Sequence, residues 1–588
     1  MATVCTHCGD GCTTTLGVRP CETGMEIVRG SNRDKSGING DFLCIKGRYG
    51  FDFTAHPERL KQPLVRRNGR LIPTSWEEAL STVAGRLREI RDSSGGNSIG
   101  VIGSTRTTNE ESYLLQKVAR VVLHTNNIDH HRTADFPALF RALGDKSNAT
   151  ASMRNVFDAP AILLIGSDPT YQHPLLAWQV RNNVRLHRSR LYLINARPIK
   201  LTRQAAHFVQ VDGGTEGKAV AFLAGDDSAL EHCAGDRSGR EKLTALRDKL
   251  RTEKDLIIAF GSELRGEGIA MLVRFGAAIP GCKWVCLGDY ANSRGAADMG
   301  LYPDLLPGYV PLSQGAAFRE VWDEEFPTQS GLNLLRMIEA AKEGGLKALY
   351  VVGSNPVARY HIDPFVLQSA FLVVQDLFLT ETAQLADVVL PATCAYEKSG
   401  SFTNTCGDLQ RLRKAAEVVG PKSDLEIIAH LGHDMGYPIG KLVTRGEGVR
   451  ADTGQSRGVQ SGEVDRQAVW MQRQNLEPRL GPFDPNAVLD EIRRLVPSYC
   501  STHVDCSGQK EAAESNQSAS RDAASEGQLI VPSQDDLFSS GTLGRYCRVL
   551  EDVMESRLVL PNEREASDSE LLPEPRQWND PGSVRPGS

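Results

Sequence analysis

The segment AILLIGSDP at residues 161–169 has a near copy, ALYVVGSNP, at residues 348–356. Each consists of five apolar residues followed by Gly-Ser, an Asp or Asn, and Pro. A continuous apolar run that ends in turn residues is typical of a strand buried on both faces of a parallel sheet. Two copies 187 residues apart therefore predict two related α/β halves.

Other apolar runs extend this pattern along the chain. They occupy residues 191–194, 256–260, 284–287 and 371–374, and helical segments alternate with them. This alternation predicts a doubly wound parallel sheet in each half. Gly-Ser-Asx after a strand is usual in a tight turn, but it also permits close approach of a nucleotide-like ligand at the sheet edge. Both interpretations remain open at this point.

Capping signals place two helices near the first predicted strand. Ser75 stands three residues before Glu78, the spacing of a capping box, and apolar residues then recur at helical period. We predict a helix over residues 75–92. A second helix is expected after the strand at residues 99–104, with Asn109 as its N-cap.

Four cysteines near the N-terminus form the clearest candidate metal site. Cys5, Cys8, Cys12 and Cys44 have the spacing Cys-x2-Cys-x3-Cys-x31-Cys. Thiolates select iron–sulfur clusters or zinc, but structural zinc sites usually pair two short knuckles, whereas one compact triplet here has a distant partner. We predict that these four residues bind one [4Fe–4S] cluster. Zinc is the alternative metal, and Cys21 is a spare cysteine that could replace Cys12 or Cys44.

Composition indicates a soluble globular protein. The chain has 588 residues, of which 40% are hydrophobic and 24% charged, enough for three or four domains. The other cysteines are scattered, which favours a reducing compartment. No secretory or twin-arginine signal precedes the cysteines, and no apolar stretch reaches the length of a membrane helix. We therefore expect a cytoplasmic protein.

Charge is distributed unevenly along the chain. Residues 501–588 contain 16 Asp and Glu against 8 Lys and Arg, within a formal net charge of −6 for the whole chain. The remainder carries no strong basic patch, so a nucleic-acid partner is not expected. The stretch 501–528, rich in Ser, Ala, Glu and Gln, is typical of a disordered linker.

Several motifs, together with the cysteine spacing, resemble the molybdopterin oxidoreductase superfamily. They are ANSRGAADMG at 291–300, LPGY at 306–309, GSNP at 353–356, QDLFLTET at 375–382, ADVVLPA at 386–392 and EKSGSFTN at 397–404. The superfamily includes formate dehydrogenases and the large iron–sulfur G subunit of bacterial respiratory complex I. The resemblance covers roughly residues 1–430. It implies that Cys5, Cys8, Cys12 and Cys44 ligate the cluster and that Lys46 lies between the cluster and a pterin pocket.

One position separates the enzymes of this superfamily from the complex I protein. Formate dehydrogenases carry a cysteine or selenocysteine on the metal shortly after an Asn-Asn-Ile-Asp-like segment, here residues 126–129, and Asp135 stands there instead. Aspartate could in principle replace it, although a surface or capping role is commoner. The adjacent His130 and His131 could act as acid and base, although we expect them to be solvated. The resemblance thus favours the G subunit, so we expect no catalytic residue and no bound molybdopterin guanine dinucleotide.

The expected organisation follows from these observations. We predict a cluster domain at residues 1–60, an α/β body at 61–435, a polar excursion with helices at 436–500, and an acidic linker with a truncated C-terminal domain at 501–588. The G subunit normally begins with a ferredoxin-like region that carries further clusters, so we expect either that another polypeptide supplies them or that this chain is a fragment. The implied partners are the other peripheral-arm subunits of complex I, and the membrane would be reached only through them.

Overall fold

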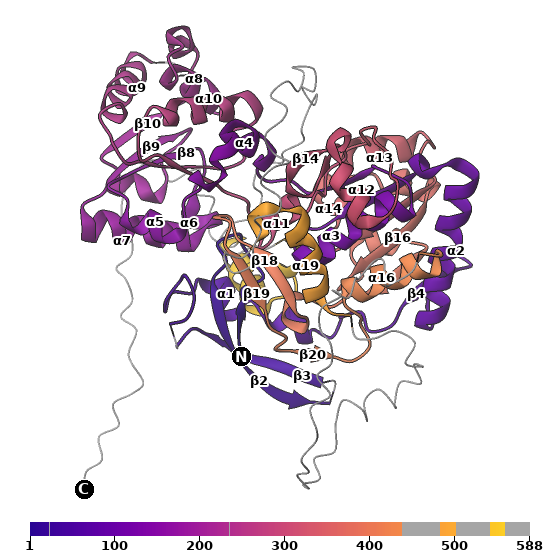
Figure 1. Cartoon of the computed structure of the whole chain (residues 1–588). Coiled ribbons are helices and arrows are strands. Elements are labelled where there is room, and N and C mark those ends of the chain that lie inside the picture. The colour runs from indigo at the N-terminus through magenta and orange to yellow at the C-terminus, as the bar shows by residue number, and fades with distance from the viewer. Residues whose placement is uncertain (23, 34, 234–235, 438–482, 501–540, 559–588) are drawn as a thin grey trace, which may run out of the picture.

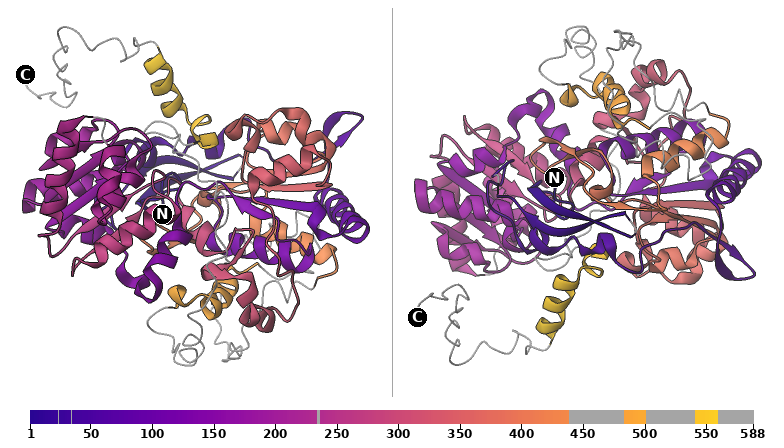
Figure 2. Two further views of the ribbon diagram at one scale, coloured as in Figure 1. Left: turned by 90° about the horizontal axis from the view of Figure 1, so that it is seen from above. Right: turned by 90° about the horizontal axis from the view of Figure 1, so that it is seen from below.

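The computed structural model describes residues 1–22, 24–33, 35–233, 236–437, 483–500 and 541–558. Two lobes lie side by side, each built on a parallel sheet covered by helices, and an antiparallel sheet at the N-terminus lies across their junction (Figures 1 and 2). The predicted fold class, a small cluster domain followed by two related α/β units, is confirmed. Most of the predicted excursion at 436–500 and the linker at 501–528 fall outside the described residues.

The larger lobe contains a seven-stranded sheet in which the central strands are parallel. In spatial order its strands are β5 (Arg70–Pro73), β4 (Leu64–Arg67), β17 (Val388–Pro391), β16 (Phe371–Asp376), β15 (Ala348–Val352), β6 (Ile99–Gly103) and β7 (Ile128–His130). β4 and β5 join antiparallel at one edge. The chain runs outward from β6 to β7 on one side and from β15 to β17 on the other, so the strand order reverses between β6 and β15. Such a reversal is where open α/β sheets bind ligands.

Helices cover both faces of this sheet. They are α2 (Trp76–Ser94), α3 (Asn109–Lys117), α12 (Ala316–Trp322), α16 (Asp424–Asp434) and α19 (Pro485–Leu495) on one face, with α13 (Leu334–Lys342), α14 (Pro356–Tyr360) and α15 (Glu381–Leu385) on the other. Side chains of the same strand enter different cores, for example Tyr350 on the α2 face and Val351 on the α13 face. This two-sided burial explains the continuous apolar runs in the sequence.

The second lobe contains a five-stranded sheet in which every pair is parallel. Its strands are β10 (His207–Gln210), β9 (Arg190–Asn195), β8 (Ala161–Ile165), β11 (Ile257–Phe260) and β12 (Lys283–Cys286). Its helices are α4 (Phe136–Leu143), α5 (Met153–Asp158), α6 (Pro169–Gln172), α7 (Pro174–His187), α8 (Glu216–Leu223), α9 (Arg237–Leu250) and α10 (Gly266–Ala277). Both near-copies of the opening motif form strands with the predicted bounds, β8 and β15.

The N-terminal sheet is antiparallel. It consists of β1 (Ala2–Val4), β2 (Thr13–Cys21), β3 (Gly24–Ser31) and, from far along the chain, β20 (Glu417–Val418). The short helix α1 (Ile45–Tyr49) follows it. Small hairpins β13 (Leu305–Leu306) with β14 (Val310–Pro311), and β18 (Gly400–Thr403) with β19 (Leu409–Leu412), and the helix α11 (Ser293–Asp298) complete the body.

One of the two predicted helix N-caps is confirmed and the other is not. Ser75 caps α2 by accepting a hydrogen bond from the Glu78 backbone N–H, so that prediction is confirmed. The Asn109 prediction is wrong by one residue: Thr108 is the cap, its hydroxyl accepts from the Glu111 N–H, and the Glu111 carboxylate accepts from the Thr108 N–H. Asn109 instead donates to the hydroxyls of Ser401 and Thr403, because β18 packs against this end of the helix.

Two helices at 541–558 are the last described elements. α20 (Gly541–Gly544) lies against the larger lobe, and α21 (Arg548–Leu558) projects from the body (Figure 2). Tyr546 between them stacks on Phe378, with ring centroids 3.5 Å apart. Among the helices of the described ranges, none combines the length and apolar character that crossing a membrane requires.

Candidate iron–sulfur centre and adjoining cavity

The four predicted cysteine ligands come from two segments that meet beside the second lobe. We call residues 5–12 the cysteine loop. Its ends are closed by a hydrogen bond from the Cys5 N–H to the Cys12 carbonyl oxygen at 2.8 Å, which continues the pairing of β1 with β2. Cys44 is the N-cap residue of α1. Cys5, Cys8 and Cys12 are buried, and Cys44 is partly buried.

The four predicted ligand thiols lie close enough to one another to raise each other's pKa. Burial raises the pKa of Cys5 to about 12, and Cys44 adds to this rise. Burial also raises the pKa of Cys12, with further contributions from Cys8, Cys5 and Cys44. Thiols with raised pKa values retain their protons unless a metal displaces them, so metal binding here would release protons.

Lys46 lies next to this group and is buried, with 4% of its surface exposed. Its ammonium opposes the burial-driven rise in pKa of Cys5, Cys8 and Cys44. The position is therefore not that of a solvated surface lysine. A buried cation beside thiolates favours their charged form and would stabilise a negatively charged cluster.

The neighbouring Gly47 keeps the backbone close to the thiols. A Cβ on Gly47 would lie 3.6 Å from the Cys5 sulfur and 3.0 Å from the Leu43 side chain. In the described part of the chain, no group of three or more His, Cys, Asp or Glu side chains is arranged to hold a metal ion. A tetranuclear cluster does not require the thiols to converge on one metal ion, as a zinc site does. Each thiolate binds a different iron, and the four sulfurs surround a larger body. The donor set, four soft sulfurs beside one buried ammonium, fits an iron–sulfur cluster.

The cysteine loop is fixed to the second lobe by a buried carboxylate. Asp10 accepts hydrogen bonds from the His173 Nδ1 and from the Leu175 N–H, each at 2.9 Å. Gly9 packs against the backbone of Gly288, where a Cβ would come within 2.2 Å of the carbonyl oxygen. The loop is therefore held by residues from α7 and from the segment that follows β12.

The cysteine loop also contacts the larger lobe. Arg106, just beyond β6, donates from Nη1 to the carbonyl oxygen of Thr6 at 2.9 Å. Cys8 forms an isolated antiparallel bridge with Tyr290. Arg106 lies over the Tyr290 ring, 4.7 Å from its centroid. These contacts connect the thiol site with a cavity that Arg106 and Tyr290 also line.

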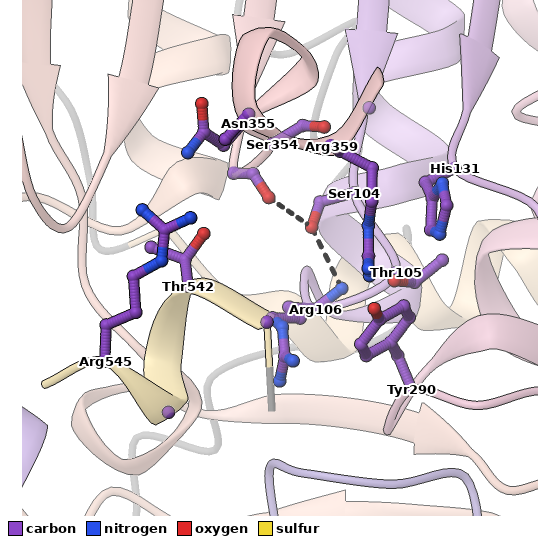
Figure 3. Close-up of a pocket in the computed structure, with 15 residues that line it drawn as sticks. Ser104, Thr105, Arg106, His131, Tyr290, Ser354, Asn355, Arg359, Thr542 and Arg545 are labelled. Atoms are coloured by element: carbon purple, nitrogen blue, oxygen red, sulfur yellow. Dashed lines mark hydrogen bonds between the residues drawn. The ribbon is translucent and has the colours of Figure 1, made fainter. Parts of the chain in front are cut away.

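This cavity of about 310 Å³ lies at the carboxyl ends of β6 and β15, where the strand order reverses. Figure 3 shows three arginines around it, Arg106, Arg359 and Arg545, together with Ser104 and Ser354. The further lining residues are Gly103, Thr105, His131, Tyr290, Gly353, Asn355, Ala358, Gly541, Thr542 and Gly544. The Gly-Ser-Asn motif that follows β15 thus lines a real cavity together with Gly103 and Ser104 at the end of β6, and α20 from the C-terminal segment forms part of its wall.

The cavity has a cationic and hydrogen-bonding wall. Arg359 lies 5.4 Å from the Tyr290 ring centroid, so the guanidiniums of Arg106 and Arg359 share one aromatic ring. Arg545 is paired with Glu381 at 2.6 Å. The Ser104 hydroxyl donates to the Gly353 carbonyl at 2.7 Å and accepts from the Arg106 N–H at 3.0 Å, which joins the two strand ends. Planar guanidiniums bind phosphate oxygens well, so this wall fits a phosphate-bearing ligand.

Comparison with known proteins places this geometry in a family. Residues 59–434 match the family described as Molybdopterin oxidoreductase, and residues 1–56 match the Molybdopterin oxidoreductase Fe4S4 domain. The chain belongs to the molybdopterin oxidoreductase family. The match over 1–56 supports a [4Fe–4S] cluster in the N-terminal segment.

Relatives in this molybdopterin oxidoreductase family carry different names. The chain is 33% identical over 447 residues to the second G subunit of the NADH-quinone oxidoreductase of Rhizobium meliloti, and the match covers 71% of this chain and 51% of that protein. It is 32% identical over 486 residues to the F420-dependent formate dehydrogenase subunit alpha of Methanocaldococcus jannaschii, covering 74% and 70% of the two chains. The chain spans about half the length of the first relatives it matches.

A solved structure has a similar fold. Acetylene hydratase from Pelobacter acetylenicus superposes with a TM-score of 0.52 over 74% of this chain and 69% of that chain, at 15% sequence identity. At this identity the likeness concerns the fold alone. Because the matched family is that of molybdopterin enzymes, the expected absence of molybdopterin guanine dinucleotide is not supported.

The position at which formate dehydrogenases place their metal ligand has a structural role here. Asp135 is the N-cap of α4: its Oδ1 accepts from the Ala138 N–H at 3.1 Å, and its Oδ2 accepts from the Gly266 N–H at 2.9 Å. Both carboxylate oxygens are thus engaged by the backbone. This agrees with the capping interpretation and does not fit a carboxylate that is directed at a metal.

The prediction that His130 and His131 are solvated is wrong. They are 3% and 8% exposed, because Tyr302 packs against His130 while Tyr290 and Tyr360 pack against His131. His130 Nδ1 donates to the Leu301 carbonyl, and burial lowers its pKa to about 4. His131 lines the cavity and hydrogen-bonds through Nδ1 to the Tyr360 hydroxyl at 2.8 Å. Burial, the largest cause, raises the pKa of Tyr360, so this hydroxyl remains protonated.

Sequence reasoning missed the arginines and the tyrosine of the cavity. Arg106 stands three residues after the end of β6, and Arg359 stands three residues after the GSNP motif at 353–356. A basic residue shortly after each strand end was therefore an available signal. Arg545 and Tyr290 had no such signal, because they reach the cavity from remote segments.

Proposed function

We propose that this chain is an iron–sulfur electron-transfer and scaffold subunit of an NADH:quinone oxidoreductase, similar to the G subunit of complex I. Cys5, Cys8, Cys12 and Cys44 hold one [4Fe–4S] cluster in this proposal, and the bound cluster supplies one-electron transfer. Lys46 and the buried surroundings of the thiols set the charge environment of the cluster. The other peripheral-arm subunits are the proposed partners. The proposed location is cytoplasmic, at the membrane only through those partners.

The observation that carries this choice is the double hydrogen bonding of Asp135. A carboxylate whose two oxygens accept backbone N–H groups of α4 and Gly266 is a structural residue. In this proposal Asp135, at the position that matches the metal ligand of formate dehydrogenases, has a structural role and does not ligate molybdenum. The Rhizobium meliloti relative, which is named as a G subunit, adds support.

A second candidate is a molybdopterin-dependent oxidoreductase of the formate dehydrogenase type. The arginine-lined cavity and the relatives named as formate dehydrogenases favour it. In that case Arg106, Arg359 and Arg545 would hold the phosphates of a pterin nucleotide, with Ser104 and Ser354 as hydrogen-bonding neighbours. A bound pterin would supply oxygen or hydride chemistry at its metal.

Metal and pterin analysis separates the two candidates. The protein is purified anaerobically from a host that makes molybdopterin, and iron, zinc, molybdenum, tungsten and released pterin are measured. We expect about four irons per chain, no stoichiometric molybdenum or tungsten, and no oxidation of NADH or formate by the isolated chain. Stoichiometric molybdenum or tungsten with formate turnover would reject the subunit proposal. Zinc in place of iron would reject both.

A further inference from the structure

Arg106 contacts two sites at once. Its guanidinium lines the cavity between β6 and β15 (Figure 3), and its Nη1 donates to the carbonyl oxygen of Thr6, which follows Cys5 in the cysteine loop. Arg359 and Arg545 line the same cavity, but their guanidiniums contact the Tyr290 ring and the Glu381 carboxylate. Arg106 thus lines the cavity and is hydrogen-bonded to the cysteine loop at the same time.

Tyr290 provides a second connection between the same two sites. Its ring carries Arg106 on the cavity side, at 4.7 Å from the centroid, and its backbone is bridged to Cys8. Tyr290 is 5% exposed and therefore firmly packed. A shift of Arg106 toward a ligand in the cavity would alter both the hydrogen bond to Thr6 and the cation that lies over Tyr290.

We propose that Arg106 couples occupancy of the cavity by a phosphate-bearing anion to the reduction potential of the cluster. This inference rests on the proposed [4Fe–4S] cluster. The bound anion lowers the reduction potential, and reduction of the cluster weakens binding of the anion by the same factor, because coupling between two binding equilibria is reciprocal. Arg106 is a positioning residue in this scheme, since it acts on the cluster through the loop that holds it.

The direction of the expected shift in reduction potential follows from charge. Reduction adds one electron from the external reductant to the cluster and makes it more negative, with no bond made or broken. A cation near the cluster favours the reduced form, and an anion nearby disfavours it. An anion in the cavity adds negative charge and attracts the Arg106 guanidinium away from the Thr6 carbonyl. Both effects favour the oxidised cluster.

The test is a redox titration of the full-length holoprotein followed by electron paramagnetic resonance, with and without inorganic pyrophosphate. The same protein is examined by equilibrium binding of pyrophosphate in its oxidised and dithionite-reduced states. We expect pyrophosphate to bind about tenfold more weakly to the reduced protein, within the usual range of allosteric coupling. For a one-electron couple, tenfold corresponds to a lowering of the potential by about 59 mV.

Variants distinguish the role of Arg106 from that of Arg545, which lines the same cavity. In Arg106→Gln we expect a lower potential without ligand and a pyrophosphate-induced shift reduced to a small fraction of the wild-type value. Arg106→Lys keeps the positive charge and should recover part of the ligand-free potential. Arg545→Gln is the matched control, because Arg545 lines the same cavity without contacting the cysteine loop: its affinity should fall while its ligand-free potential stays at the wild-type value.

The outcomes distinguish this inference from the proposed function. No [4Fe–4S] signal in the holoprotein would reject the proposed function together with the inference. A normal cluster whose potential does not respond to pyrophosphate, or a response that Arg106→Gln retains in full, would reject the inference alone. Absence of pyrophosphate binding to the oxidised protein would also reject it.

Discussion

The Asp135 carboxylate accepts a hydrogen bond from the backbone N–H of Gly266, 131 residues further along the chain, at 2.9 Å. Its other oxygen caps α4. Asp135 thereby joins the first turn of α4 to the start of α10, two helices that pack on the same face of the second sheet. At Asp135, where the resemblance to formate dehydrogenases places a metal ligand, the carboxylate thus links two helices of the fold.

Removal of this link should cost stability and leave the metal content unchanged. Asp135→Ala removes an N-cap and one acceptor for Gly266, so we expect a loss of about 2 kcal/mol in the free energy of unfolding. Urea unfolding under anaerobic conditions, with iron and molybdenum analysis of the same samples, measures both quantities. Asp135→Asn retains an acceptor oxygen and should lose less. A stable Asp135→Ala protein that has lost bound molybdenum would contradict this role.

The cysteine ligands are tested by single substitutions to serine. Cys8→Ser should lose most of the roughly four irons of a cubane and its broad visible absorption, because a hydroxyl is a hard and poorly ionised ligand. Cys21→Ser is the control: Cys21 ends β2, is partly buried, and should be dispensable. Iron analysis and absorption spectra measure whether each variant retains the cluster. Loss of iron in Cys21→Ser with retention in Cys12→Ser or Cys44→Ser would reassign the ligand set.

A buried ion pair attaches α19 to α3. Lys117 Nζ lies 2.8 Å from Glu491 Oε1, both side chains are at most 2% exposed, and the Tyr113 hydroxyl donates to the same oxygen at 2.6 Å. Glu491→Ala leaves a buried ammonium without its counter-ion, so we expect a loss of about 3–5 kcal/mol in unfolding free energy. The double variant Lys117→Met with Glu491→Leu should recover most of it in the same urea assay. Equal losses in the single and double variants would show that packing, not charge, dominates.

Glu110 should make stability depend on pH. Burial, the largest cause, raises its pKa from 4.5 to about 7, while hydrogen bonds from Ser401 oppose the rise. A carboxyl whose pKa is higher in the folded state binds more protons there than in the unfolded chain. Stability therefore falls as pH rises from about 4.5 to 7, by on the order of 3 kcal/mol from this group.

The measurement compares urea midpoints of the wild type and Glu110→Gln between pH 5 and 8. The wild-type midpoint should decrease relative to that of the variant across this range. Above about pH 7.5 the curves of midpoint against pH should be parallel for the two proteins. Asp376, whose pKa is also raised to about 7 by burial, contributes equally to both proteins and cancels in the difference. Parallel curves over the whole range would show that Glu110 remains ionised in the folded protein.

Local sequence determined the secondary structure and the cysteine pattern. The apolar runs became β8 and β15 with the predicted bounds, and Ser75 begins α2, because strand burial and helix capping depend on residues close in sequence. The family resemblance likewise followed from short motifs. The spacing of Cys5, Cys8, Cys12 and Cys44 predicts one ligand set, which stays a prediction with Cys21 as the spare cysteine.

Tertiary structure decided what surrounds these elements. The cap of α3 moved to Thr108, and His130 became buried, because distant segments pack over both. The cavity combines strand ends near residues 103 and 353 with Tyr290 and Arg545, and Arg106 reaches the cysteine loop 100 residues earlier in the chain. Burial and electrostatic contact depend on the packing of residues far apart in sequence, and for that reason only the folded chain shows which residues join the cavity to the cysteine loop.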